Sequence, residues 1–138
     1  MPVVTRWYIR AGLLYLVLAL LAGALVVAPA AIATLPVVPG LLPVYFHLLM
    51  VGWVTHLIIG VAYWMFPRHS RERPRGRDSL FFAAFGLLNT GLMLRAIGEP
   101  LQAAGITTGG PLLVASALLQ LAGGWAAVAA LWPRVRER

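Results

Sequence analysis

VYFHLLMVGWVTHLIIGVAYWMFP, residues 44–67, decides the fold of this chain. The stretch is apolar over the length of about 20 residues that a helix needs to cross a bilayer. It ends in aromatic residues followed at once by Arg68, the combination that gathers at a membrane–water interface. His47 and His56 lie inside the run, and an imidazole in a membrane span usually has a metal, a haem, a proton path or another helix as its partner.

The composition is that of a membrane protein. Hydrophobic residues make up 61% of the 138 residues and charged residues 11%, which is too apolar for a soluble domain of this size. The absence of cysteine excludes disulfides, thiolate metal sites and covalent c-type haem attachment. The net charge of +7 comes wholly from arginine and clusters beside the apolar runs, so we expect a lipid bilayer and no nucleic acid as the partner.

Hydropathy predicts an all-α fold, an integral membrane four-helix bundle in a single domain over residues 1–138. The first apolar run is too long for a signal peptide and is interpreted as a true helix. The four expected spans cover about 7–31, 44–66, 80–97 and 111–132.

Arginine placement predicts the orientation. Arginines lie near the start of the first span, throughout the loop 68–77 and in the tail, whereas the loop after the first span carries no charge. Because positive charge stays on the cytoplasmic side during insertion, we expect a multi-pass protein of the cell inner membrane with both termini cytoplasmic. His69, in the basic loop, is interpreted as a solvated residue. Trp7, Tyr8, Trp64 and Trp132 are expected to form an aromatic belt at this boundary.

The two histidines of the second span are expected to act separately. On a regular α-helix, nine positions give about 180° of rotation and a rise of about 13.5 Å, so one haem cannot take both His47 and His56 from one helix. His56 lies near the middle of the span, and its default interpretation is a buried histidine bonded to a neighbouring hydroxyl or carbonyl.

Arg95 and the glycines of the spans each admit two interpretations. Arg95, near the end of the third span, either reaches the outer headgroups and pairs with Glu99, or supplies a counter-charge for a haem propionate above an iron bound at His47. Glycines such as Gly52 either let two helices approach closely or make room for a flat macrocycle.

The segment from His47 to Pro67 resembles the second transmembrane helix of the catalytic subunit of haem–copper oxidases and nitric oxide reductases. The matching features are an initial histidine, Gly-Trp five residues on, a later glycine, and a Tyr-x-x-x-Pro exit. The start, His-Leu-x-x-x-Gly-Trp, and the stretch LMLRAIGEPL at 92–101 are also similar to small four-span proteins that resemble the cbb3-type subunit.

The resemblance implies a b-type haem, or another haem held without covalent bonds, with His47 as iron ligand and Arg95 near the propionates. Gly52 and Tyr45 are the other residues expected to contact it, and His56 is a candidate second ligand. The implied role is electron transfer with a redox partner protein, or binding of a diatomic gas such as O2 or NO. Three histidines in all do not support a complete oxidase or nitric oxide reductase centre in one chain.

A homo-oligomer, trimer or dimer, is expected, because the family's twelve-helix subunit resembles three four-helix arcs and one chain looks like one arc. Two alternatives stay open. One is a haem-free accessory or assembly subunit of a respiratory complex, in which the histidines are structural. The other is a small transporter with a polar path lined by His56, Asn89 and Gln120, although no second intramembrane acid is present to complete a proton relay.

Overall fold

The computed structural model describes residues 1–27, 34–66 and 78–135, and these residues contain helices and no strand. Four helical spans among them are long and apolar enough to cross a bilayer, which confirms the predicted all-α membrane fold. The elements are α1 (Val3–Val26), η1 (Val38–Gly40), α3 (Leu41–His47), η2 (Leu48–Thr55), α4 (His56–Met65), α5 (Asp78–Ala103), α6 (Gly109–Leu131) and η3 (Trp132–Arg134).

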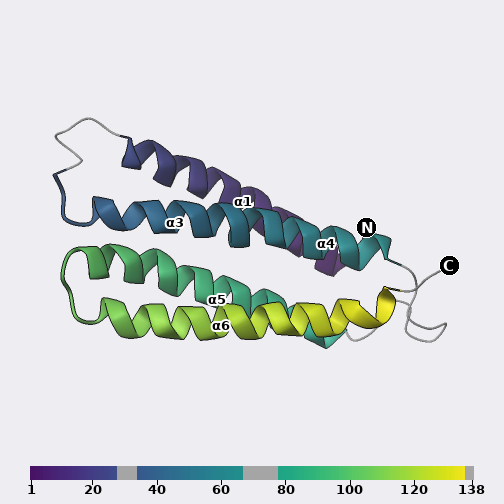
Figure 1. The fold of residues 1–138 in the computed structure, drawn as a ribbon. Coiled ribbons are helices and arrows are strands. Elements are labelled where there is room, and N and C mark those ends of the chain that lie inside the picture. Colours follow the sequence, from purple (N-terminus) through teal and green to yellow (C-terminus); the bar gives the residue numbers. More distant parts are fainter. Residues whose placement is uncertain (28–33, 67–77, 136–138) are drawn as a thin grey trace.

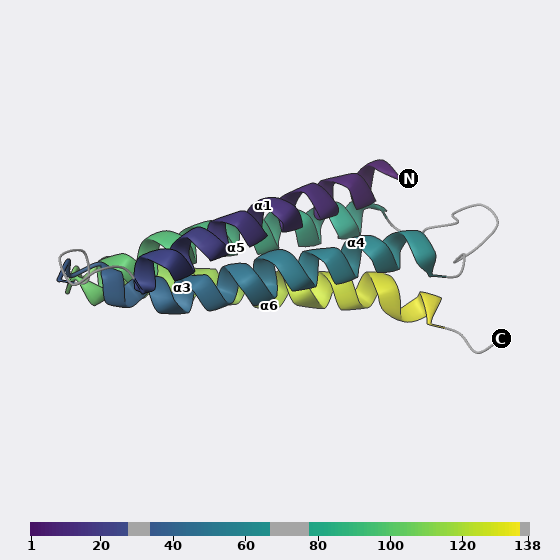
Figure 2. The same cartoon turned by 90° about the horizontal axis from the view of Figure 1, so that it is seen from above.

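The helices form two antiparallel hairpins that lie side by side (Figures 1 and 2). In the first hairpin α1 packs along α3, η2 and α4, and in the second α5 packs along α6. Among the described elements α5 contacts both hairpins, whereas α6 meets the first hairpin through α4 alone. The start of α1 and the end of α6 lie at one end of the bundle, here called the terminal end, as the predicted path requires. The opposite end is called the far end.

Glycines set the close approach of the helices. A Cβ on Gly52 would lie 2.7 Å from the Cβ and Cγ of Tyr15, and one on Gly60 would lie 2.8 Å from the Cβ of Tyr8. Two tyrosines of α1 therefore rest directly on the backbone of the second span. Gly91 of α5 receives Gln120 of α6 in the same way, with a Cβ-to-Cγ distance of 2.7 Å. Such contacts stabilise helix pairs in lipid, where water release contributes nothing between them.

The second span is not the continuous α-helix that the sequence predicts. The eight residues of η2 form a π-helix, and η1 is a short 3-10 turn. Buried residues recur every four positions along this span: Val44, Leu48, Gly52, His56 and Gly60. On a regular α-helix such a series would drift by about 40° per step. The wider turn of the π segment offsets that drift and keeps one line of side chains facing the core.

Span boundaries differ from the prediction by a few residues. The first helix begins at Val3 and ends at Val26, so the expected end at residue 31 lies outside the described residues. The third helix continues six residues past the predicted end, through Pro100 to Ala103. Tyr8 is also misplaced by the prediction. It is fully buried and its hydroxyl donates to the Phe81 carbonyl at 2.8 Å, so it is a core residue and not part of an aromatic belt.

Arg134 joins the two hairpins at the terminal end. Its guanidinium is buried and donates from Nη2 to the carbonyls of Tyr63 at 3.0 Å and Phe66 at 2.8 Å. The last carbonyls of a helix have no partner within it, so a buried arginine satisfies the end of α4. The Tyr63 hydroxyl in turn donates to Asp78 Oδ1 at 2.6 Å, where α5 begins.

Candidate functional site

His56 is fully buried at the centre of the bundle, and both of its ring nitrogens have partners. Nδ1 lies 2.9 Å from the carbonyl oxygen of Val51, five residues earlier. Nε2 lies 3.1 Å from Nδ2 of Asn89 on α5. Val51 belongs to the π segment. The π-helical turn therefore coincides with a hydrogen bond between the His56 side chain and a backbone carbonyl of the same span. A backbone carbonyl thus satisfies His56, as its default interpretation requires.

The orientation of Asn89 fixes the protonation of this histidine. Asn89 Nδ2 lies 2.6 Å from the carbonyl of Phe85, which only accepts, so the amide NH2 group must face it. The second hydrogen of that NH2 group is donated to His56 Nε2, which therefore carries no proton. Asn89 Oδ1 accepts from the Tyr15 hydroxyl at 2.6 Å. His56 is held as the neutral Nδ1–H tautomer in a closed network that links α1, α4 and α5.

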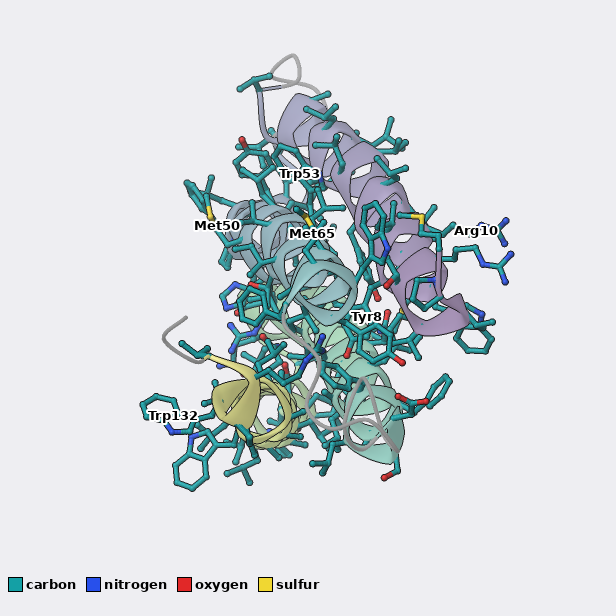
Figure 3. The ribbon with its side chains drawn as sticks, turned by 90° about the vertical axis from the view of Figure 1, so that its right-hand side faces the viewer. Tyr8, Arg10, Met50, Trp53, Met65 and Trp132 are labelled. Carbon is teal, nitrogen blue, oxygen red and sulfur yellow. The ribbon has the colours of Figure 1, made fainter. Side chains whose placement is uncertain are left out.

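Aromatic rings enclose the same histidine. The ring centroids of Tyr8, Tyr15 and Phe85 lie 5.4, 5.5 and 5.8 Å from that of His56. Figure 3 shows Tyr8 among the helices, whereas Arg10 and Trp132 extend outward. In this arrangement His56 offers no free nitrogen to a metal. Its contribution here is to bind the two hairpins together.

His47 differs from His56 in burial and in bonding. It is the last residue of α3, it is half-buried, and its Nδ1 lies 2.9 Å from the carbonyl of Pro43 one turn earlier. A carbonyl accepts only, so Nδ1 carries the proton and the lone pair is on Nε2. No described residue forms a hydrogen bond with Nε2. A neutral imidazole anchored through one nitrogen, with the other available, is the form in which histidine binds a metal.

Arg95 forms the ion pair with Glu99 that one of its two interpretations proposed. Nη1 lies 2.6 Å from Glu99 Oε1, and the two side chains are 18% and 15% exposed. The Nε atom is buried without a partner among the described residues. Arg95 lies three positions after Leu92, which packs against α3, so both lie on the α5 face that is turned toward the first hairpin.

His47 and Arg95 lie at nearby depths in the bundle. Gly40 packs directly on the Glu99 backbone, so these two residues share a level. His47 lies seven residues from Gly40 along its span, and Arg95 lies four residues from Glu99 along α5. In both cases the direction is from the far end toward the middle of the bundle. At a rise of about 1.5 Å per residue, Arg95 is about 4.5 Å nearer the far end than His47. The similar depth of the two residues agrees with their sequence positions, and the role of Arg95 as a counter-charge above an iron at His47 stays a prediction.

The other two residues predicted to contact a cofactor face α1. Gly52 receives Tyr15, so its missing side chain serves close helix packing. The Tyr45 ring lies 3.1 Å from the position of a Cβ on Gly23 of α1. It also lines an apolar pocket of about 380 Å³ between α1 and α3. The structure does not bring Gly52 and Tyr45 together with Arg95.

The residues of the proposed transport path belong to two separate clusters. Asn89 bonds to His56, whereas Gln120 Nε2 donates to Ser116 Oγ at 2.9 Å, and Ser116 Oγ donates to the Gly91 carbonyl at 2.7 Å. The second cluster joins α5 to α6. His69 lies outside the described residues, and no group of three or more metal-binding side chains occurs in 1–27, 34–66 and 78–135.

Sequence reasoning grouped His56 with Asn89, its hydrogen-bond partner, but missed the aromatic neighbours of His56. Tyr15 and Phe85 belong to ordinary apolar spans, and only the folded arrangement assigns them to His56. A polar residue in the middle of each of three spans was the available clue, because lone polar groups in lipid seek one another. Compared with protein-family models, curated proteins and solved structures, the chain matches none.

Proposed function

We propose that this protein is a membrane-embedded b-type haem protein of the cell inner membrane, with both termini cytoplasmic and His47 as an iron ligand. One observation carries the assignment. His47 is anchored at Nδ1 by the Pro43 carbonyl, while Nε2, its lone pair available, has no described hydrogen-bond partner. An imidazole with one nitrogen anchored and the other lone pair accessible has the form that an iron ligand needs.

The surroundings of His47 suit a haem. The bonded Nδ1 fixes the tautomer and the orientation of the ring. Arg95 lies slightly nearer the far end and already holds one carboxylate, Glu99, so its face of α5 accepts carboxylate groups. Its buried, unpartnered Nε is a further donor, suited to a propionate. Phe46, Leu48 and Met50, the neighbours of His47 along the span, are apolar, and an apolar surrounding would tune the reduction potential of a bound haem.

The haem would supply one-electron transfer or the binding of a diatomic gas, and the chain would provide its ligand, its burial and its counter-charge. Electron transfer with a redox partner protein is the role favoured by a six-coordinate iron. Gas binding is favoured if one axial position stays open. The described residues provide one available imidazole, which supports a haem without the second metal of an oxidase centre.

A haem-free accessory subunit is the second candidate, and the closed network around His56 favours it. That network explains a buried histidine without any ligand, and the glycines that face Tyr8 and Tyr15 are explained by packing. Under this alternative His47 would contact a neighbouring subunit of a larger complex.

Optical spectroscopy of the detergent-purified protein, oxidised and then reduced with dithionite, separates these candidates. We expect a Soret band in the wild type that is lost in His47→Ala and retained in Leu118→Ala. Leu118 is a fitting control because it is an exposed residue of α6, on a different helix from His47. A shift of the reduced spectrum with carbon monoxide would assign gas binding. Absence of a Soret band after expression with added haem would leave the accessory subunit.

A further inference from the structure

We propose that the haem is shared between two copies of this chain, with His47 of each copy binding one face of the iron. This inference rests on the proposed function and names the partner that completes its site. In a twofold assembly the same residue meets its counterpart across the axis, so a single ligand per chain becomes a pair.

The ligand inventory of the described residues leads to this conclusion. His56 has both nitrogens engaged, one to Val51 and one to Asn89, and it is enclosed by three aromatic rings. The sequence holds no cysteine and one further histidine, His69. His69 lies outside the described residues, and among the described ones His47 is the imidazole with an available nitrogen.

The side of α3 next to His47 is suited to a second copy. Phe46 and Met50 flank it at helical spacing and are 51% and 53% exposed, and Met50 extends away from α1 (Figure 3). Phe46 and Met50 carry no charge, and Arg95 at a nearby depth is paired with Glu99 through Nη1, with its Nε as the donor for a propionate. Two such surfaces can therefore approach in lipid without desolvating an unpaired ion.

The first test counts haem and chains together. Two differently tagged copies are co-expressed, and the species carrying both tags is isolated in mild detergent. We expect a native mass of two chains, one haem per two chains and a six-coordinate reduced spectrum. Pairing a wild-type chain with a His47→Ala chain is expected to open one axial position and make the reduced haem react with carbon monoxide.

The second test needs no haem spectrum. The chain is free of cysteine, so Met50→Cys introduces a single thiol beside the proposed axis and is expected to form a disulfide-linked dimer under mild oxidation. Leu118→Cys, at a comparably exposed position on α6, is the matched control and is expected to remain uncrosslinked.

The outcomes separate this inference from the proposed function. One haem per chain in a monomer, or a six-coordinate spectrum that survives pairing with His47→Ala, would overturn the shared site and leave His47 as a haem ligand. Equal crosslinking of Met50→Cys and Leu118→Cys would also overturn it. A preparation that binds no haem would overturn the proposed function and this inference with it.

Discussion

Replacing Asn89 with leucine tests the network that joins the two hairpins. Leucine has the same number and branching of side-chain heavy atoms as asparagine but bears no polar atom, so His56 Nε2 and the Tyr15 hydroxyl each lose their partner. An unsatisfied buried polar group costs about 1–3 kcal/mol in proteins. Hydrogen bonds between membrane helices average only about 0.6 kcal/mol, because the unfolded chain also finds partners.

We expect Asn89→Leu to lower the free energy of unfolding by about 2 kcal/mol, between these limits. Full burial of His56 prevents it from finding another partner, which favours the higher range. The assay is reversible unfolding in mixed micelles, followed by circular dichroism. Thr90→Val, at the next position and exposed, is the matched control and is expected to be neutral.

A second substitution, Tyr15→Phe, is expected to affect stability in opposite directions in the wild type and in the Asn89→Leu background. Tyr15→Phe removes the hydroxyl that donates to Asn89, so in the wild type it should destabilise the fold by about 1 kcal/mol. In the Asn89→Leu background the same substitution removes an unsatisfied hydroxyl and should stabilise the fold. Additive effects, or a loss below about 0.5 kcal/mol for Asn89→Leu, would refute the network as a source of stability.

Three further predictions concern packing, helix ends and topology. Gly52→Val should destabilise the fold by about 1–3 kcal/mol because its Cβ would meet a tyrosine ring at 2.7 Å, whereas Gly86→Ala, with open space around it, should be neutral in the same unfolding assay. Arg134→Met should cost about 1.5–3 kcal/mol in that assay through the loss of two bonds to carbonyls at the end of α4, and a neutral result would contradict its capping role. In intact spheroplasts a membrane-impermeant thiol reagent should label Ile106→Cys and spare Val135→Cys, and the reverse pattern would invert the proposed orientation.

The number and type of spans were predictable because apolar length alone decides them. A helix satisfies its backbone internally, so four long apolar runs have few other folds in a bilayer. The π segment was not predictable in this way, since residues 48–55 carry no proline or other local marker of a wider turn. The π segment is reflected in buried residues at a constant spacing of four, but this spacing can be recognised only when the burial of each residue is known.

The histidines show how far site prediction reaches. The high cost of a bare imidazole in lipid correctly predicted that His56 would be bonded to a neighbouring group, and Val51 supplies the carbonyl. The rotation of about 180° between His47 and His56 assumed a regular helix. The eight π-helical residues between them invalidate that assumption. The contacts of Gly52 and Tyr45 depend on which helix packs against the second span at these positions. Sequence spacing does not show that this helix is α1.

Haem titration of the apoprotein carrying His47→Gly, with and without free imidazole, tests the haem assignment most directly. Removing the side chain leaves a space at the ligand position that imidazole can fill. We expect the variant to lose the Soret band of the wild type and to regain it when millimolar imidazole is added. Retention of haem by His47→Gly at wild-type affinity without imidazole would contradict the assignment of His47 as the iron ligand.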